Sequence, residues 1–344
     1  MEENKDIKKY KELASYPNLI KNFYDFKAIG SGGFGRVYSA KYKKTGQVFA
    51  IKTLYCRDES KLKTVLTRFK NECQILKNIK HKNVVKITGV YINNDESYYA
   101  MEMINGQSLK DKIAQSGKIE TETAVNYLSQ ICMGLIEIHN QNIVHRDIKP
   151  SNILIDKNTE DVKLIDFGIS INEESLRMTE DNKTVGSVQY IAPEILQKEA
   201  DASIQSDIYA LGILLYEMLE GSVPFNAKDP KIIMSNHINL GIPRLKNVNV
   251  TIPQPLENII IRCTAKKPEQ RYENCKALLE DLTTCLSEKR AAEPLLNLNE
   301  KSSSKKIKKF LSSKVKSISI ISVLAFAIVI IILVIVLWFK GVIH

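Results

Sequence analysis

The residues most able to do chemistry lie in one short segment, 145–152, with the sequence HRDIKPSN. The carboxylate of Asp147 can accept the proton of a substrate hydroxyl, and the ammonium group of Lys149 can neutralise a phosphate. The amide oxygen of Asn152 can bind magnesium. Asp166, which follows the strand-like segment 162–165, offers a carboxylate for the same metal. This combination predicts the transfer of a phosphoryl group to a hydroxyl.

A glycine-rich segment nearer the N-terminus can hold the phosphates of a nucleotide. Residues 30–37 (GSGGFGRV) fit the pattern G-x-G-x-x-G-x-V, in which glycines let the backbone approach a phosphate and the valine covers a flat base. Alone, the pattern also fits a glycine-rich hairpin without a ligand, or a dinucleotide fold. The following segment, Val48–Lys52, reads as a strand, whereas a helix follows the glycine loop of a dinucleotide fold. Lys52 then lies where a cation can hold the α- and β-phosphates.

The order of the motifs is more specific than any one of them. The triplet 166–168 (DFG) comes fourteen residues after Asn152, and 192–194 (APE) closes a stretch rich in hydroxyl side chains. Together the motifs resemble the eukaryotic-like protein kinase family, over residues of about 23–285. The resemblance implies an α+β fold with a strand-rich N-lobe and a helical C-lobe. It also implies ATP with Mg²⁺, or Mn²⁺ as an alternative, in the cleft between them.

The resemblance implies a role for each motif residue. Catalysis is assigned to Lys52, Asp147 and Lys149, and metal binding to Asn152 and Asp166. The other contacts to ATP are implied for Ile29, Gly30, Ser31, Gly32, Gly33, Phe34, Gly35, Val37, Ala50, Glu72, Met101 as the gatekeeper, Glu102, Ile104 and Leu154.

Glu72 is assigned as the partner of the strand lysine, Lys52. It lies on a helix that apolar residues at three- and four-residue intervals predict over Lys61–Ile79. In the family this glutamate pairs with the lysine that orients the phosphates, here Lys52. The nearby alternative is Glu59, which is expected to precede the helix.

Three residues of the predicted C-lobe are implied to hold the fold. Asp207, at the start of a mostly apolar helix predicted over Asp207–Leu219, is expected to brace the catalytic loop. Glu194 and Arg271 are expected to form a structural ion pair. For all three residues, the role implied by the resemblance is the same as an ordinary structural role: they hold the fold and take no part in the chemistry.

The same resemblance indicates Ser/Thr of protein substrates as the acceptor. Lys149, two residues after Asp147, is the form found in Ser/Thr kinases, and 186–190 (GSVQY) resembles their substrate-binding loop. Arg146 marks, in this family, kinases activated by phosphorylation of the activation loop, where Thr179 and Thr184 are candidate autophosphorylation sites. A pseudokinase that acts as a scaffold is disfavoured because no motif residue is missing. A tyrosine or small-molecule kinase is disfavoured by Lys149.

The net charge of +10 belongs to a short segment and not to the predicted kinase region. Residues 301–317 carry seven lysines and no acid, and Lys340 adds one more, so subtracting these eight leaves +2 for residues 1–300. A nucleic-acid partner is therefore not expected.

The six cysteines contain no CxxC pair, which argues against a zinc site or disulfide scaffold and favours a reducing compartment. The content of 44% apolar and 26% charged residues argues against a wholly disordered, collagen-like or polytopic membrane protein.

A membrane span is predicted near the C-terminus. Residues 318–339 carry no charge, and as a helix they would extend about 33 Å, enough for a hydrocarbon core of roughly 30 Å. Seven lysines before the span against one after it place the preceding chain in the cytoplasm. The first residues have no apolar core, so no signal peptide is expected. We therefore expect a single-pass protein anchored by its C-terminal helix.

The motifs, the charge and the apolar run divide the chain into six predicted segments. In order, the segments are a polar and loosely ordered lead-in (1–22), the N-lobe (23–104), the C-lobe (105–285), a basic juxtamembrane stem (286–317), the membrane span (318–339) and a short outer tail (340–344).

The stem, the span and the segment 206–212 (SDIYALG) resemble bacterial receptor-type Ser/Thr kinases. Only five residues follow the span, so we expect no outer sensor domain. A partner protein, a homodimer through the helix or constitutive activity would then replace it. A composition rich in Lys, Asn and Ile favours a bacterial plasma membrane, with an internal membrane of a unicellular eukaryote as the alternative. The stem lysines are expected chiefly to enforce topology, and attraction of anionic lipid is a second interpretation.

Overall fold

The computed structural model describes residues 6, 8–32, 35–54, 59–93, 96–166, 188–246, 248 and 251–298. Residues Met1–Leu295 form one compact unit, and Leu296–His344 are assigned to a second. Among the residues described, no helix is both long and apolar enough to cross a membrane. The predicted span at 318–339 and the lysines of 301–317 lie outside the described residues.

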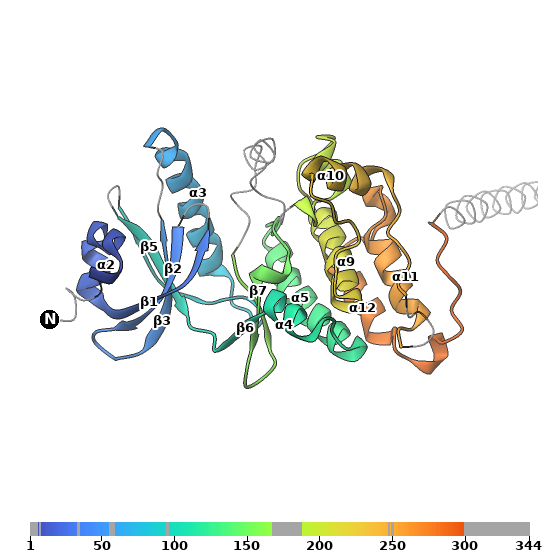
Figure 1. Cartoon of the computed structure of the whole chain (residues 1–344), viewed down its shortest axis with the longest axis horizontal. Helices are drawn as coiled ribbons and strands as arrows, with labels where there is room; N and C mark the ends of the chain where they lie inside the picture. Colours follow the sequence, from blue (N-terminus) through green and yellow to red (C-terminus); the bar gives the residue numbers. More distant parts are fainter. Residues whose placement is uncertain are drawn as a thin grey trace, which may run out of the picture. The chain divides into compact units, whose positions relative to one another are not determined.

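The N-lobe is built on a five-stranded antiparallel sheet with the order β1-β2-β3-β5-β4 (Figure 1). The strands are β1 (Phe23–Gly32), β2 (Gly35–Tyr42), β3 (Val48–Leu54), β4 (Ile87–Ile92) and β5 (Ser97–Glu102). One long helix, α3 (Glu59–Asn78), lies against this sheet, and its Val65, Phe69, Cys73 and Leu76 share a hydrophobic cluster with Ala50, Tyr99 and Met101. This helix agrees with the one predicted over Lys61–Ile79 except that it begins two residues earlier and ends one residue earlier. The expectation that Glu59 precedes the helix is wrong, because α3 begins at Glu59.

The N-terminal segment is ordered where the structure describes it. A short 3₁₀ helix, η1 (Lys11–Ser15), leads into α2 (Pro17–Asn22). Leu13, Tyr16 and Leu19 are buried in a cluster with Phe26, Tyr38 and Tyr98 of the sheet. The expectation of a loosely ordered lead-in is therefore wrong for this part. The physical reason is the three-residue spacing of these apolar side chains, which gives a lysine-rich segment one apolar face.

The link between this segment and the sheet also includes hydrogen bonds. The Glu96 carboxylate, which precedes β5, accepts the backbone N–H groups of Asn18 at 2.9 Å and Leu19 at 2.7 Å. These are unpaired donors of the first turn of α2, so Glu96 caps this helix from a distant part of the chain.

The C-lobe is mainly helical (Figure 1). A small antiparallel sheet, with the order β6-β7-β8, stands where the chain enters it. The elements in chain order are β6 (Gly106–Ser108), α4 (Leu109–Ser116), α5 (Thr121–Asn140), η2 (Pro150–Asn152), β7 (Ile153–Asp156), β8 (Val162–Leu164), α8 (Pro193–Leu196), α9 (Ile204–Glu220), α10 (Pro230–Asn239), α11 (Gln254–Cys263), η3 (Pro268–Gln270), α12 (Cys275–Thr284) and η4 (Glu288–Arg290).

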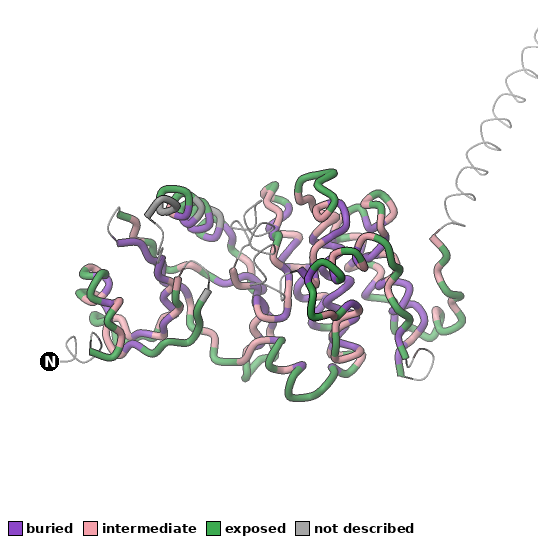
Figure 2. The backbone as a smooth tube through the Cα atoms, turned by 45° about the horizontal axis from the view of Figure 1, so that its top comes forward, coloured by how far each residue is buried: buried purple, intermediate pink, exposed green. Residues whose placement is uncertain are grey.

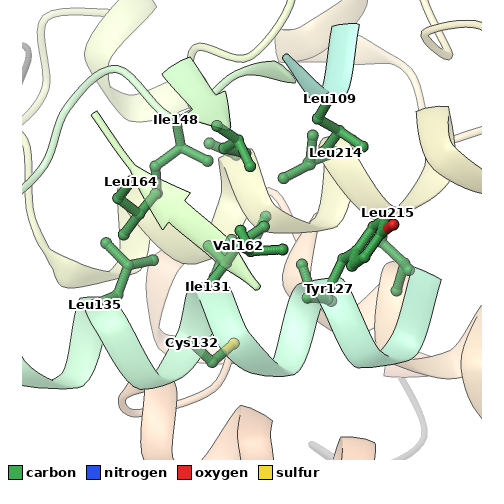
Figure 3. Packing of buried hydrophobic residues seen from close by; sticks show 14 of the residues in the cluster. Leu109, Tyr127, Ile131, Cys132, Leu135, Ile148, Val162, Leu164, Leu214 and Leu215 are labelled. Atoms are coloured by element: carbon green, nitrogen blue, oxygen red, sulfur yellow. The ribbon is translucent and has the colours of Figure 1, made fainter. Parts of the chain in front are cut away.

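Two central helices, α5 and α9, carry the core of this lobe. One face of α5 is buried, and Figure 3 shows Tyr127, Ile131 and Leu135 of this helix packed near Leu214 and Leu215 of α9 and Val162 and Leu164 of β8. Buried residues concentrate inside the lobe, with exposed residues along its outer surface (Figure 2). The core therefore holds α9 and β8 rigidly, and these two elements flank the residues of the predicted site.

Helix α9 is longer than predicted because both of its ends are well defined. Ser203 and Ser206 form a capping box at its N-terminus. Gly221 adopts a left-handed conformation with φ 79° at its C-terminus, where the helix ends. Asp207 consequently lies in the first turn of the helix, and not at its first residue.

Candidate active site

The two lobes enclose a cavity of about 740 Å³, a size typical of sites for small ligands. Most of the residues predicted to contact ATP line it, together with the predicted catalytic and metal-binding residues. From the N-lobe and the connection to the C-lobe these are Ile29, Gly30, Ser31, Gly35, Val37, Ala50, Lys52, Glu72, Met101, Glu102 and Ile104. From the C-lobe they are Asp147, Lys149, Asn152, Leu154 and Asp166. Residues up to 137 positions apart in the chain, Ile29 and Asp166, thus converge on one cavity.

Strand register brings the N-lobe residues to the cavity. Val37 of β2 lies opposite Lys52 of β3, and Ala50 of β3 lies opposite Met101 of β5. Because side chains alternate along a strand, Ala50 and Lys52 share one face of the sheet. Gly35, where β2 begins, is a close-packed position. A Cβ atom there would lie 1.8 Å from the Thr53 carbonyl oxygen, so this position requires glycine.

Lys52 joins three elements through its ammonium group. Its Nζ lies 2.8 Å from Oε1 of Glu72 on α3 and 2.8 Å from Oδ1 of Asp166, two residues beyond β8. Burial alone would lower the pKa of Lys52, but the Asp166 and Glu72 carboxylates beside it raise this pKa well above its ordinary value. Burial would likewise raise the pKa of Asp166, yet the Lys52 ammonium beside it holds this pKa below its ordinary value. Both groups are therefore charged at neutral pH.

The sequence HRDIKPSN forms a compact polar cluster beside this pair. Nζ of Lys149 lies 2.6 Å from Oδ2 and 2.8 Å from Oδ1 of Asp147. Asn152, in η2, donates from Nδ2 to the Asp147 backbone carbonyl at 2.9 Å and to its Oδ2 at 2.7 Å. The carboxylate of Asp147 is thus oriented from two sides and faces the same cavity as Lys52.

Two residues of the site adopt left-handed backbone conformations that side chains other than glycine seldom adopt. The φ angle is 69° at Arg146 and 56° at Asp166. Such angles persist only where neighbouring contacts hold them. For Arg146 the contact is visible, because its backbone N–H donates to Oδ1 of Asp207 at 2.9 Å, while the His145 N–H donates to Oδ2 at 2.8 Å. Asp207 is buried in α9, so the core helix fixes the path of the catalytic loop.

A buried histidine completes the support of that loop. Nε2 of His139 on α5 lies 2.9 Å from Oδ2 of Asp207. Burial alone would lower the pKa of His139, but the hydrogen bond to Asp207 and the nearby Cys275 thiol raise it to about 9. His139 is therefore positively charged at neutral pH and compensates the negative charge of the Asp207 carboxylate.

The other predicted structural pair lies deeper in the C-lobe. The Arg271 guanidinium binds Glu194 in bidentate fashion, with NH1–Oε1 at 2.8 Å and NH2–Oε2 at 2.7 Å. Its remaining N–H groups donate to the backbone carbonyls of Ala265, Gln205 and Lys266. The guanidinium also stacks 4.9 Å from the ring centre of Tyr209. Every part of this cation has a protein partner.

Comparison with known proteins places the chain in a family. A profile described as the protein kinase domain matches residues 23–292. The chain belongs to the protein kinase family. The kinase domain is 36% identical over 277 residues to the serine/threonine-protein kinase PrkC of Bacillus subtilis, covering 80% of this chain and 42% of that protein. It is 34% identical over 275 residues to a probable serine/threonine-protein kinase PknB of Lactococcus lactis, covering 80% and 43%. The chain thus spans less than half the length of these relatives.

A solved structure confirms the predicted bilobal fold. The structure of Rad53 residues 1–466 in complex with AMP-PNP matches with a TM-score of 0.64 at 24% sequence identity. The match covers 79% of this chain and 68% of that chain. The strand-rich N-lobe and the helical C-lobe of the kinase domain are therefore as the sequence predicted.

Several residues that line the cavity were not predicted. Gln107, Ser108 and Asp111 follow the connection between the lobes, and Ser108 caps α4 by accepting the Asp111 N–H at 3.1 Å. A serine three residues before an acid is a known start signal for a helix, so the sequence did contain a clue to this part of the wall. Val65 and Phe69 of α3 also reach the cavity. Their spacing predicted a buried helix face but not the ligand site that it borders.

Some predicted residues cannot be placed. Gly33, Phe34, Thr179 and Thr184 lie outside the described residues, and Gly32 is described only as the last residue of β1. In the part of the chain that is described, no group of three or more His, Cys, Asp or Glu side chains is arranged to hold a metal. The predicted metal ligands, Asn152 and Asp166, are one amide and one carboxylate on the cavity wall.

Proposed function

We propose that this chain is a serine/threonine protein kinase, which transfers the γ-phosphate of ATP to hydroxyl groups of proteins. The observation that carries the proposal is the convergence of two polar clusters on one cavity. Lys52, Glu72 and Asp166 form the first cluster, and Asp147, Lys149 and Asn152 form the second. The relatives named above support the choice of Ser/Thr because their names carry this specificity.

The wall of the cavity suits MgATP. Ile29, Val37, Ala50 and Leu154 provide apolar surface for a flat base, and the backbone of Glu102 and Ile104 borders the same space. Deeper in the cavity, Asp166 and Asn152 offer a carboxylate and an amide oxygen, which are the oxygen ligands that Mg²⁺ accepts alongside phosphate and water. When bound, the metal would neutralise part of the phosphate charge.

The side chains of this chain then have distinct tasks. Lys52, held by Glu72, orients the phosphates, and Lys149 neutralises the phosphoryl group in transit. Asp147 orients the acceptor hydroxyl and takes its proton. A bond forms between the hydroxyl oxygen and the γ-phosphorus, and the bond from that phosphorus to the bridging oxygen breaks, which releases ADP. Because the transition state is loose, most of the acceleration comes from positioning and charge neutralisation.

Regulation by autophosphorylation is part of the proposal. Arg146 directly precedes Asp147. A phosphate on Thr179 or Thr184 would carry negative charge, which the Arg146 guanidinium can bind well. Replacing both threonines with alanine should therefore slow the enzyme by reducing the population of its ordered activation segment.

The decisive test is the substitution Asp147→Asn in the full-length chain. This change keeps the hydrogen-bonding shape but removes the proton acceptor, and general bases contribute roughly 10² to 10⁴ in rate. Phosphate transfer to a generic Ser/Thr protein should fall by about that factor, while binding of MgATP measured by calorimetry stays within about twofold. Asp201→Asn, which removes an exposed carboxylate of the C-lobe, is the matched control and should keep full activity.

Mass spectrometry of the wild-type reaction should locate phosphate on Thr179, Thr184 or both. A wild-type chain that binds MgATP but labels neither itself nor a substrate would instead favour a scaffold built on a kinase fold. Loss of MgATP binding in Asp147→Asn would mean that Asp147 has a different role.

We also propose that residues 318–339 anchor the kinase domain in a membrane, with the domain in the cytoplasm and a bacterial plasma membrane as the favoured site. The apolar run and the asymmetry of flanking lysines support this. After alkaline carbonate washing, the full-length chain should remain with membranes, and a chain ending at Lys316 should be released. Binding of the latter to anionic vesicles, compared with a chain ending at Glu300, tests whether the stem attracts lipid. Release of the full-length chain would contradict the anchor.

A further inference from the structure

One buried tyrosine contacts the lysine–glutamate pair from within the N-lobe. Tyr99 lies on β5, directly opposite Lys52 in the β3–β5 register, and is only 1% exposed. Its hydroxyl donates to Oε1 of Glu72 at 2.9 Å. The same oxygen accepts from Nζ of Lys52 at 2.8 Å, so two donors on neighbouring strands converge on one carboxylate oxygen.

The ring of Tyr99 makes a second contact with the same helix. It lies 5.4 Å, centre to centre, from the ring of Phe69, which is one turn before Glu72 on α3. The ammonium group of Lys52 lies 5.7 Å from the centre of the Tyr99 ring, within range of a cation–π attraction. Tyr99 therefore touches α3 at two successive turns and also touches the lysine that this helix serves.

The hydroxyl of Tyr99 can act only as a donor toward Glu72. Burial raises the pKa of Tyr99 well above its ordinary value, Lys52 opposes this shift, and the Glu72 carboxylate adds to it. The phenol thus stays protonated over the physiological range and donates to Glu72 from the sheet side.

We propose that Tyr99 is a positioning residue, whose hydroxyl holds the Glu72 carboxylate, and with it α3, at the place where it pairs with Lys52. Its consequence for phosphoryl transfer rests on the proposed function, whereas its effect on α3 does not. The described side-chain hydrogen bonds from the sheet to α3 end on Glu72, so the loss of one bond should measurably raise the population in which α3 moves away.

Cys73 provides a readout that needs no catalysis. It follows Glu72 on α3 and is 2% exposed, so its thiol reacts only when this part of the helix leaves the sheet. The experiment measures the rate of alkylation of Cys73 by iodoacetamide in the full-length chain, resolved by mass spectrometry of its peptide. Cys263 and Cys285, buried in the C-lobe, report global unfolding in the same sample.

The matched pair of variants is Tyr99→Phe and Tyr98→Phe. Each removes one hydroxyl from a buried tyrosine of β5. The Tyr98 hydroxyl, however, donates to Oδ1 of Asn18 at 2.7 Å, on the side of the sheet that faces the N-terminal segment. A role in general stability would make the two variants behave alike. A role in positioning Glu72 is specific to Tyr99.

We expect Tyr99→Phe to speed alkylation of Cys73 about tenfold, as for a lost hydrogen bond to a charged group, while Tyr98→Phe leaves the rate unchanged. MgAMP-PNP should slow the reaction in Tyr99→Phe, and kcat/KM for ATP should fall in this variant alone. Equal rates in wild type and Tyr99→Phe, or equal acceleration in both variants, would overturn the proposal.

Two further arms keep the result interpretable. If Tyr99→Phe does not fold, Glu72→Gln weakens the same bond from the acceptor side and should accelerate Cys73 alkylation likewise. A wild-type chain without transferase activity would overturn the proposed function, and the Cys73 rates would still decide whether Tyr99 positions α3.

Discussion

Among the described residues, the ion pair Glu194–Arg271 of the C-lobe and the ion pair Lys52–Glu72 of the N-lobe are both buried, and the two pairs are built differently. In the C-lobe, both oxygens of Glu194 bind Arg271, whose side chain is 0% exposed, and the rest of the guanidinium binds backbone carbonyls and an aromatic face. In the N-lobe, Lys52 binds single oxygens of Glu72 and Asp166, and its side chain is 22% exposed to the cavity. The first pair is closed, and the second is open toward a ligand.

The difference separates stability from chemistry. A planar guanidinium with five donors matches a carboxylate and surrounding carbonyls, so Arg271 has no donor left for a ligand. An ammonium on a flexible stem can exchange one acceptor for another at little cost. Lys52 can therefore give up part of its contact with Asp166 when phosphate oxygens enter the cavity. The open pair is the one that sequence motifs mark as catalytic.

The largest expected effect compares the same substitution in the two pairs. Glu194→Gln leaves Arg271 charged and buried without a counter-charge, so the free energy of unfolding should fall by about 3–5 kcal/mol. Glu72→Gln leaves Lys52 with Asp166 and with access to the cavity, so stability should change by about 1 kcal/mol or less while transfer activity falls strongly.

Urea unfolding followed by circular dichroism is the suitable measurement, because the single tryptophan, Trp338, lies in the predicted membrane span. If Glu72→Gln destabilised the fold as much as Glu194→Gln, the distinction between a closed and an open pair would be wrong.

The catalytic half of the site was predictable from short motifs. Asp147, Lys149 and Asn152 are close in sequence, so any fold that keeps this segment compact brings their side chains together. The lysine–glutamate pair was harder, because Lys52 and Glu72 lie on different elements. The resemblance to a family, and not the periodicity of α3, selected Glu72.

The N-terminal segment shows where composition misleads. Its lysines suggested a solvated lead-in, yet Leu13 and Leu19 are fully buried against the sheet. The groups that hold it, Glu96 and Tyr98, are about 80 residues away, so their contacts could not be found in the local sequence. A three-residue apolar spacing was the only local signal, and it is short.

Tyr99 could not be predicted for a different reason. Tyr98 and Tyr99 are adjacent in a strand, so one of them faces each side of the sheet. Which one faces α3 depends on the register of β5 with β3, and this register follows from tertiary pairing and not from residue type. A tyrosine hydroxyl reaching Glu72 has no motif of its own.

A smaller expected effect is the dependence of stability on pH, through the titration of His139 in the C-lobe. His139 and Asp207 form a third buried contact, on the closed C-lobe side, and the pKa of His139 is raised from about 6.5 in the unfolded chain to about 9 in the folded chain. A raised pKa means that the folded state binds the proton more tightly. This contribution is therefore complete below pH 6.5 and is lost as the pH rises through about 9.

The substitution His139→Gln removes this titrating group and keeps a side chain that can donate to Asp207. The difference in unfolding free energy between wild type and variant should be largest near pH 6 and should shrink by about 3 kcal/mol toward pH 9.5. Over the same range Lys52 stays charged, because its pKa is raised well above its ordinary value. The pair Lys52–Glu72 should therefore keep its charges while the contact between His139 and Asp207 weakens. A difference that stayed constant, or grew with pH, would mean that the proton on His139 does not stabilise the support of the catalytic loop.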